Sequence, residues 1–151
     1  MSDDYVHSIL DELGTVLDSD KREAAISYFR SIAPRADEIS TWSMETLEFI
    51  LCGANFGTIT CPSCGGAFAA DCWNDRMDSD VSEAGFTLTR RAMPCCGAEF
   101  TLHDLAYEWP QGFAPSGVRA MNPNIGKLSD EQRARFESII GCRVRVIYEH
   151  L

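Results

Sequence analysis

Seven cysteines constrain the fold of this 151-residue chain more than any other feature of its sequence. They stand at positions 52, 61, 64, 72, 95, 96 and 142. Their number is odd, and the acidic start of the chain, Met1-Ser2-Asp3-Asp4, lacks the basic and then apolar residues of a secretory signal. Both observations argue against the disulfide framework of a secreted protein. We therefore expect a cytoplasmic protein whose clustered cysteines stay reduced and bind a metal ion.

Two segments that hold four of these cysteines repeat one another. Residues 61–68, CPSCGGAF, align without gaps on residues 93–100, MPCCGAEF, with Pro, Cys, Gly and Phe at equivalent places. Two cysteines three residues apart in a tight turn can bring both sulfurs within about 2.3 Å of one ion. Proline presets φ in such a turn, and glycine lets backbone N–H groups face the sulfurs. The spacing therefore predicts a pair of metal-binding turns.

The CPxCG pattern resembles the paired knuckles of the zinc-ribbon family, in which each turn offers two thiolates to one tetrahedral zinc ion. The resemblance covers about residues 58–102 and implies one structural Zn²⁺ ion held between β-hairpins. It implies an architecture and no particular activity. A structural zinc ion can contribute an apparent ~10–16 kcal/mol to the folded state.

The second segment departs from the pattern at its first ligand position. Met93 stands there, and a thioether is a poor ligand for zinc, while Cys95 occupies the variable position. We expect the ion to be bound by Cys61, Cys64, Cys95 and Cys96. Cys72 and His103 are the alternatives for the fourth position. Four thiolates would close the site, whereas a catalytic zinc keeps one position open to water.

Other candidate chemistry is sparse. A Cys-x-x-Cys pair can also be a redox pair, but the second segment favours a metal site. Cys52 and Cys142, each beside a glycine, are interpreted as small buried side chains at helix ends. His7 and His150 have no nucleophile that the sequence places beside them. We therefore expect no catalytic residues and no enzyme activity.

Two further segments have structural interpretations. The acidic run of residues 71–80 lacks the glycine and final glutamate of a calcium loop, so we interpret it as solvated. The aromatic segment 105–117 is interpreted as a loop, with Trp109 and Phe113 filling a gap between a helix and a sheet rather than facing a partner.

The first third of the chain predicts helices. Apolar residues between Val6 and Leu17 match one face of a helix over residues 3–18. Asp20, with Glu23 three residues later, marks the start of a second helix that Pro34 closes. Ser43 can cap a third helix that ends near residue 53.

From residue 54 the pattern changes to short β-type runs at 58–60, 67–70, 86–90 and 99–102. The acidic residues 73–83 are interpreted as an excursion between two strands. Residues 118–121 predict a strand, residues 122–124 a turn, and residues 143–148 a final strand. Ser129 and Gln132 form a capping box that opens a helix ending at Gly141.

These elements predict an α+β fold in one domain, residues 1–151. An N-terminal helical layer (1–53) would precede a zinc-ribbon-like segment (54–104). A loop, a helix and a strand (105–151) would complete a C-terminal β–α–β element. No run approaches the roughly 20 apolar residues of a membrane span.

Charge is distributed unevenly along the chain. Residues 1–50 carry a net −7, residues 51–115 a net −5, and residues 116–151 a net +2, for a total of −10. Nucleic-acid binding depends largely on Lys and Arg at phosphates, so an acidic protein is an unfavourable partner for it. An acidic surface attracts basic proteins through long-range steering.

We therefore expect a non-catalytic, zinc-stabilised protein-binding module, such as an inhibitor, an immunity-type protein or an adaptor, with a basic protein partner. One alternative is a nucleic-acid-associated zinc ribbon, in which the basic residues of the last segment form a stripe. These residues are Arg119, Lys127, Arg133, Arg135, Arg143 and Arg145. A second alternative is an enzyme that uses the thiols or the metal.

Overall fold

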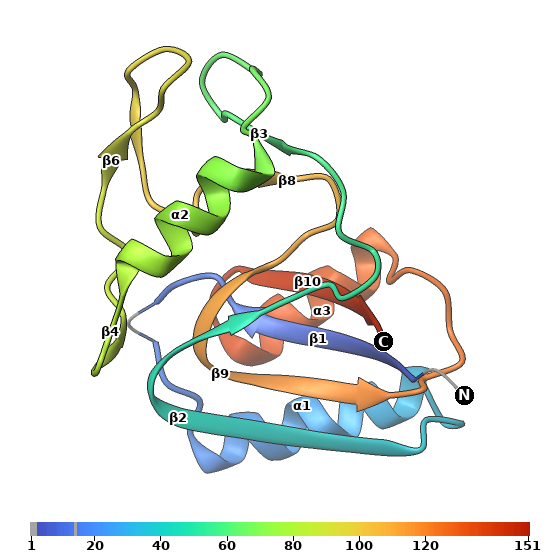
Figure 1. Ribbon diagram of the computed structural model, residues 1–151. Helices are drawn as coiled ribbons and strands as arrows, with labels where there is room; N and C mark the ends of the chain where they lie inside the picture. The colour runs from blue at the N-terminus through green and yellow to red at the C-terminus, as the bar shows by residue number, and fades with distance from the viewer. Residues whose placement is uncertain (1–2, 14) are drawn as a thin grey trace.

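A computed structural model describes residues 3–13 and 15–151 (Figure 1). It confirms the α+β class, with more strand than helix among these residues. Met1 and Ser2 of the acidic start, and Gly14 of the first predicted helix, lie outside the described residues. No described helix has the length and apolar character needed to span a membrane.

Four strands form the main sheet, and every neighbouring pair in it is antiparallel. Their order across the sheet is β10 (Val144–His150), β1 (Asp4–Leu10), β9 (Gly112–Met121) and β2 (Glu38–Ile50). Val6 in β1 lies opposite Tyr148 in β10 on one side and Ala120 in β9 on the other. The two central strands are therefore β1 and β9, and the two edges are β10 and β2.

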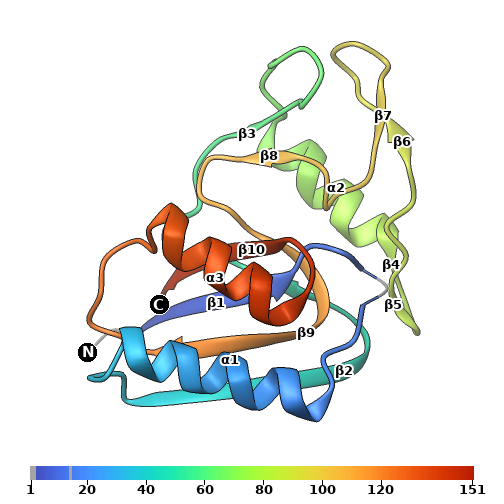
Figure 2. The ribbon, with the colours of Figure 1, turned by 180° about the vertical axis from the view of Figure 1, so that it is seen from behind.

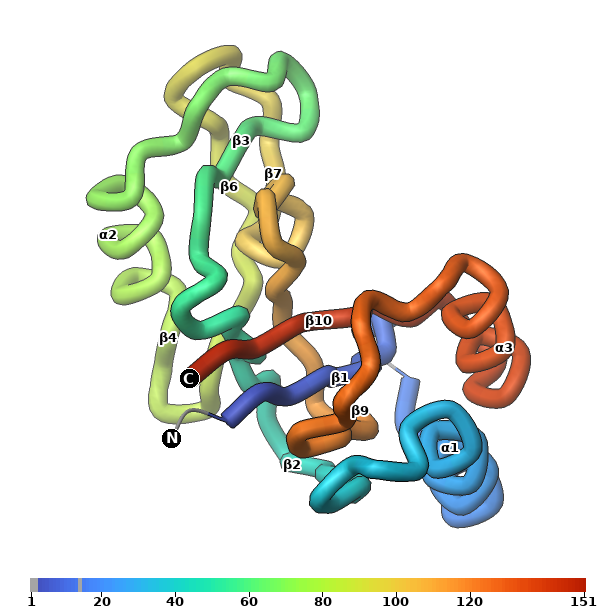
Figure 3. The backbone as a smooth tube through the Cα atoms, turned by 90° about the vertical axis from the view of Figure 1, so that its right-hand side faces the viewer, coloured from blue at the N-terminus to red at the C-terminus, as the bar shows by residue number. Residues whose placement is uncertain are grey.

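Two helices cover one face of this sheet, as Figure 3 shows. α1 (Ser19–Ile32) follows β1, and α3 (Asp130–Ile140) joins β9 to β10. The order of the main elements is thus βαββαβ, the split βαβ arrangement. Phe29 of α1 and Phe136 of α3 meet edge to face at 5.1 Å, over Val6 and Leu10 of β1. This contact forms the centre of the first hydrophobic core.

Residues 51–111 form an insertion between β2 and β9, and in Figure 3 it rises on the side of the sheet away from α1 and α3. It contains α2 (Ala70–Asp80) and six two-residue strands that pair two by two. The pairs are β3 (Ile59–Thr60) with β8 (Ala106–Tyr107), β4 (Val81–Ser82) with β5 (Gly85–Phe86), and β6 (Arg91–Ala92) with β7 (Glu99–Phe100).

A second hydrophobic core packs the insertion against the sheet. Phe113 of β9 is fully buried and lies 5.0 Å from the rings of both Phe49 and Phe86. Trp73 of α2 and Leu102 complete this core from the insertion. Phe113 is therefore buried rather than facing a partner, as predicted, but it lies in a strand and fills the space between the sheet and the insertion rather than between a helix and a sheet.

The predicted helix over residues 3–18 is wrong, because Asp4–Leu10 is strand β1. Every residue from Val6 to Leu10 is buried. A central strand packed on both faces has a continuous buried run, and this run also satisfied the helical spacing. Leu17 reaches the first core from the connection to α1.

The helix predicted after Ser43 is also wrong, because these residues belong to β2. The register between β2 and β9 shifts between Ser43 and Glu48. This irregularity removed the strict alternation by which a strand is recognised. The N-terminal layer of the fold is therefore two strands and one helix, rather than helices alone.

The acidic segment 73–83, predicted as an excursion between two strands, is mostly helical, since α2 covers Ala70–Asp80 and lies between β3 and β4. The aromatic segment 105–117 is not a single loop, since its second half belongs to β9. Of the short β-type runs, 67–70 contributes one bridge to Thr60, and 86–90 contributes only Phe86 to a strand. The runs at 58–60 and 99–102 contain β3 and β7, as predicted.

Several predicted elements are confirmed. The second helix is α1, and the final strand is β10. Both hydrogen bonds of the capping box between Ser129 and Gln132 are present at the start of α3. Gly141 ends this helix in the left-handed conformation, at φ 88°.

Candidate metal centre

The two cysteine-containing turns lie next to each other at the tip of the insertion. One turn follows β3, and the other joins β6 to β7 (Figure 2). The sulfur atoms of Cys61, Cys64, Cys95 and Cys96 all lie within 4.8 Å of one another. Two segments that are about thirty residues apart in the sequence therefore form one cluster of thiols.

The backbones of the two turns have the same hydrogen bonds, which explains the repeat in the sequence. In the first turn the Gly65 N–H donates to the Cys61 carbonyl at 2.9 Å. In the second, the Gly97 N–H donates to the Met93 carbonyl at 2.8 Å. Gly65 and Gly97 have φ values of 73° and 77°, a region that glycine enters without strain.

The sulfur positions fit a tetrahedral ion. The Cys61 and Cys96 sulfurs are 3.7 Å apart, and the Cys64 and Cys95 sulfurs are 3.3 Å apart. Zinc–sulfur bonds of about 2.3 Å in a tetrahedron give sulfur–sulfur distances of about 3.8 Å. A disulfide bond would need about 2.05 Å, and all four cysteines are free. The donor set and its size therefore suit Zn²⁺.

Met93 stands at the first position of the second turn, where the first turn has Cys61, and its side chain belongs to the core. It is 2% exposed and packs in the second hydrophobic core. Its sulfur accepts a hydrogen bond from Nη1 of Arg76 at 3.6 Å. The thiol missing at that position is supplied two residues later by Cys95, which enters the cluster from the position equivalent to Ser63.

Hydrogen bonding makes the four thiols unequal. Backbone hydrogen bonds from Cys64 and then Ser63 lower the pKa of the Cys61 thiol to about 7, against the opposing effect of burial. Hydrogen bonding with Cys64, and then burial, raises the pKa of Cys95 to about 12. Negative charge therefore collects first on Cys61, and this charge attracts a divalent cation to the cluster.

The structure does not bring the alternative fourth ligands to the cluster. Cys72 is exposed on α2. His103 is 5% exposed, and both its ring nitrogens are engaged elsewhere. Its Nδ1 accepts from the Phe113 N–H at 3.0 Å, and its Nε2 lies 3.0 Å from a carboxylate oxygen of Asp11.

The two remaining cysteines differ in environment. Cys52 is buried, as expected, but it follows strand β2 rather than a helix. Burial raises the pKa of its thiol, and its sulfur lies 3.4 Å from the side-chain oxygen of Gln111. Cys142 follows α3 and is only half-buried, with its pKa also raised by burial.

A partly buried polar junction beneath the insertion had no signal in the sequence. The Asp11 carboxylate contacts His103 and also Nε of Arg145, at 3.0 Å each. Nη1 of Arg145 donates to the carbonyls of His103 and Gln111 at 2.9 Å. The hydrogen bond from His103, and then the charge of Arg145, lower the pKa of Asp11 despite its partial burial. The junction links the end of β1, the insertion and β10.

The acidic run has a structural role at one end and is solvated along the rest. Asp80 is 3% exposed, and its carboxylate accepts hydrogen bonds from three successive backbone N–H groups, those of Thr87, Leu88 and Thr89, at 2.8–3.1 Å. Leu88 has a left-handed φ of 51° within this segment, which follows β5. The other acids of the helix are exposed, as the solvated interpretation predicts.

The remaining sequence candidates lie away from the thiols. His7 is buried and pairs with Glu149 at 2.9 Å, whereas His150 pairs with Asp4 near the chain end. Trp109 is half-buried, with the amine of Lys127 4.7 Å from its ring centroid. The structure therefore assigns these residues to local packing and ion pairs.

Comparisons of this chain with models of known protein families, with curated proteins and with solved structures found no match.

Proposed function

We propose that this chain is a non-catalytic protein-binding module, of an inhibitor, immunity-type or adaptor kind, whose insertion is stabilised by one Zn²⁺ ion. The observation that carries the metal's role is the position of the four sulfurs within 4.8 Å of one another. Four thiolates fill all the positions of a tetrahedral zinc ion and leave none for water. The cluster therefore supports a metal that holds the fold rather than one that acts on a substrate.

The chain's own residues have defined tasks in this proposal. Cys61 and Cys64 would bind the ion from the first turn, and Cys95 and Cys96 from the second. When bound, zinc supplies a crosslink between the two turns. The N–H of Gly66 lies 3.4 Å from the Cys64 sulfur, where it would share the negative charge of a thiolate.

The insertion needs such a crosslink because its own strands are very short. Each of its three strand pairs, of which β4–β5 and β6–β7 are hairpins, joins only two residues to two. An isolated two-stranded hairpin is at best marginally stable in water. An apparent ~10–16 kcal/mol from structural zinc would offset this weakness.

The surface charge supports a basic protein as partner. Asp71, Asp75 and Asp78 are exposed on α2, and their spacing of four and three residues places them on one helix face. Glu38 and Glu45 are exposed on β2. Clustered acids on a protein of net charge −10 would accelerate its encounter with a basic surface.

A nucleic-acid-associated role is the second candidate, and one observation favours it. Arg133 and Arg135 of α3 and Arg143 before β10 are exposed, and none of the three has an ion pair within the part of the chain that the structure describes. Three free guanidinium groups could contact phosphates. The net charge of the whole protein opposes this role.

Two measurements on the full chain test the proposal. Elemental analysis after purification without added metal should find about one equivalent of zinc, because a structural site binds the metal tightly. Cys64→Ser, Cys95→Ser and Cys96→Ser should each lose the metal together with solubility. Cys72→Ser and Cys142→Ser are the matched controls and should keep the metal. Iron–sulfur absorbance, or zinc binding that survives Cys95→Ser and not Cys72→Ser, would contradict the assigned ligands.

The binding function needs its own experiment. A pull-down from lysate of the source cell, at low salt and at about 0.15 M salt, should capture a basic protein whose association rate falls with ionic strength. Neutralising the α2 face with D71N, D75N and D78N should slow that association without releasing zinc. Micromolar, salt-sensitive binding of RNA or DNA that depends on Arg133 and Arg143 would replace this function by the second candidate.

A further inference from the structure

Strand β10 is an edge of the main sheet, and only alternate residues of it bond to the neighbouring strand. The Asp11 N–H donates to the Arg143 carbonyl at one end, and the Leu151 N–H donates to the Asp3 carbonyl at the other. These two bonds fix the alternation of the antiparallel pair. The odd-numbered residues of β10 therefore face β1, and the even-numbered residues direct their N–H and C=O groups outward.

The outer groups at both ends of β10 have partners within the chain. His150 bonds through its N–H to Cys52 and through its carbonyl to Ala54. The Tyr148 carbonyl accepts from the side-chain amide of Asn55 at 3.0 Å. The Val144 N–H donates to the Glu137 carboxylate at 3.1 Å. The chain thus covers its own sheet edge at these points.

The middle of the edge is left open. The Val144 carbonyl, both backbone groups of Val146 and the Tyr148 N–H have no partner among the residues that the structure describes. These four groups form a repeating pattern of donors and acceptors to which an added strand can hydrogen-bond. Leaving such groups unbonded at a poorly hydrated position is unfavourable.

Val144, Val146 and Tyr148, which carry the open groups, line a cleft of about 490 Å³. Leu128, Arg133 and Pro110 also line it. Val144 and Val146 are only 7% and 8% exposed, since their side chains pack in the first hydrophobic core. An extended peptide segment could approach this edge by itself, whereas the β10 edge of a second copy would arrive together with the residues that line its own cleft.

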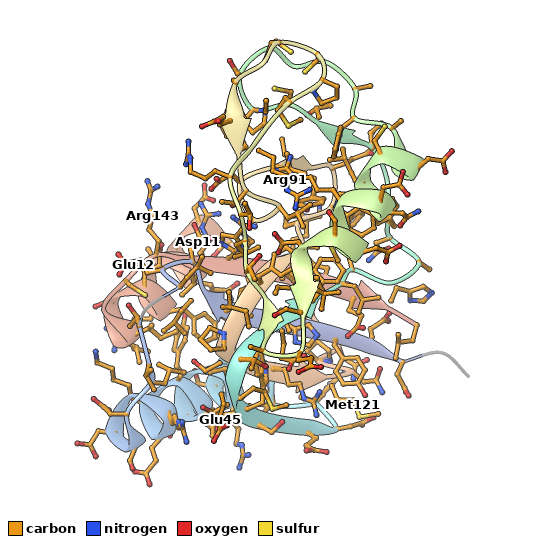
Figure 4. All side chains as sticks on the ribbon, turned by 60° about the vertical axis from the view of Figure 1, so that its left-hand side comes forward. Asp11, Glu12, Glu45, Arg91, Met121 and Arg143 are labelled. Atoms are coloured by element: carbon orange, nitrogen blue, oxygen red, sulfur yellow. The ribbon has the colours of Figure 1, made fainter. Side chains whose placement is uncertain are left out.

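Three arginines and three acids line this cleft, so their formal charges balance, unlike those of the protein as a whole, but they are not all paired with one another. Arg145 and Asp11 pair with each other, and Glu137 is held by the Val144 N–H. Arg133 and Arg143 are exposed and have no ion pair among the described residues, and the exposed acid Asp130 has none there either. Figure 4 shows Arg143 extending outward beside Asp11.

The opposite edge of the sheet is protected against an added strand. The register of β2 is irregular between Ser43 and Glu48, and Glu38 and Glu45 are exposed along it. Bulges and charged side chains are the usual means of blocking a sheet edge. The β2 edge is therefore blocked by its bulge and its charged side chains, whereas the middle of β10 is open to an added strand.

We propose that this cleft binds an extended, acidic peptide segment of a partner protein, which adds to the sheet as a fifth strand beside β10. Main-chain hydrogen bonds to Val144, Val146 and Tyr148 give the affinity, and carboxylates facing Arg133 and Arg143 give the selectivity. The site uses neither the zinc cluster nor the acidic surface, so it stands independently of the function proposed above.

The test uses the zinc-loaded full chain and a displayed library of random eight-residue peptides. Selection should enrich peptides that carry Asp or Glu among β-branched residues. The paired variant R133E and R143E should bind an enriched synthetic peptide about tenfold or more weakly. The control pair R30E and R135E changes the net charge equally outside the cleft and should stay within about twofold, because only screened long-range charge is altered.

Backbone recognition is tested with the same peptide and a copy N-methylated at alternate residues. Losing two or more main-chain hydrogen bonds should weaken binding about tenfold or more. Hydrogen exchange at the amides of Val146 and Tyr148 should slow when the unmodified peptide binds. Failure to enrich any peptide over the R133E and R143E variant, or equal binding of the methylated copy, would overturn the proposal. Protection of these two amides that rises with protein concentration alone would assign the edge to a second copy instead.

Discussion

The carboxylate of Asp11 and the imidazole of His103 form a 3.0 Å hydrogen bond across 92 residues of sequence, and this bond joins the main sheet to the insertion. Since Nδ1 of His103 accepts from the Phe113 N–H, the ring proton must lie on Nε2, where it is donated to Asp11. The histidine is thus fixed in one tautomer by two partners. His103 therefore has a structural role and is not available as a metal ligand, so the four thiols remain the candidate ligands.

His103→Ala should therefore destabilise the protein by about 1–3 kcal/mol, because it leaves the buried Phe113 N–H without an acceptor. Urea unfolding of the zinc-loaded protein measures this loss. A double-mutant cycle with Asp11→Ala should give a coupling free energy of about 0.5–3 kcal/mol. His150→Ala removes a more exposed ion pair with Asp4 and should cost within about 1 kcal/mol. Additive effects of the two Asp11–His103 substitutions would show that the bond contributes nothing.

Asp80 offers a second stability test with a matched control two residues away. Asp80→Ala removes the acceptor of three backbone N–H groups in the segment after β5, so we expect the free energy of unfolding to fall by about 2–5 kcal/mol. Asp78→Ala removes an exposed carboxylate of the same helix and should change the free energy of unfolding by about 0.5 kcal/mol or less. Equal effects of the two substitutions would refute the role given to Asp80.

Sequence patterns predicted the cysteine turns and failed for α2, and the reason lies in which residues are buried. The side of α2 that faces the core carries Trp73, Arg76, Met77 and Asp80, at the spacing of one helix face. Two of these four are charged and are buried through hydrogen bonds to backbone and to sulfur. A search for apolar periodicity cannot detect such a face. The cysteine turns, by contrast, are defined by neighbours in the sequence.

The main sheet was missed for a different reason. β1 is a central strand with five consecutive buried residues, and β2 is interrupted between Ser43 and Glu48, so neither strand alternates. The partners that make them strands are also distant, since β1 pairs with residues 117–121 and 144–150. Only α1, α3 and β10, which have local caps or strict alternation, could be predicted with nearly correct bounds.

Removal of zinc should open the insertion before the main sheet. The first core, between α1, α3 and the sheet, contains no residue of the insertion, whereas the second core depends on the two cysteine turns to hold β6 and β7. After a chelator is added, amide hydrogen exchange should accelerate in α2, β6 and β7 and change less in α1 and α3. Uniform acceleration along the whole chain would show that the sheet cannot fold without the metal.

The seven thiols should react with iodoacetamide in an order that identifies the ligands. In the zinc-loaded protein Cys72, which is exposed and outside the cluster, should react first. Cys142 and then Cys52 should follow slowly, because burial raises the pKa of both thiols and the thiolate is the reactive form. A raised pKa keeps a thiol protonated to higher pH, so their rates should climb about tenfold per pH unit through pH 8.

The cluster should enter this reaction only when the ion is removed. With zinc bound, the thiolates of the cluster are coordinated and should stay unlabelled, and a chelator should make all four accessible to the reagent, at different rates. Mass spectrometry of the digested protein assigns each label to its residue. Cys61, with its pKa lowered to about 7, should lead the four after chelation. If Cys95 reacts as fast as Cys72 while zinc is still bound, then Cys95 is not the fourth ligand and the closed site is refuted.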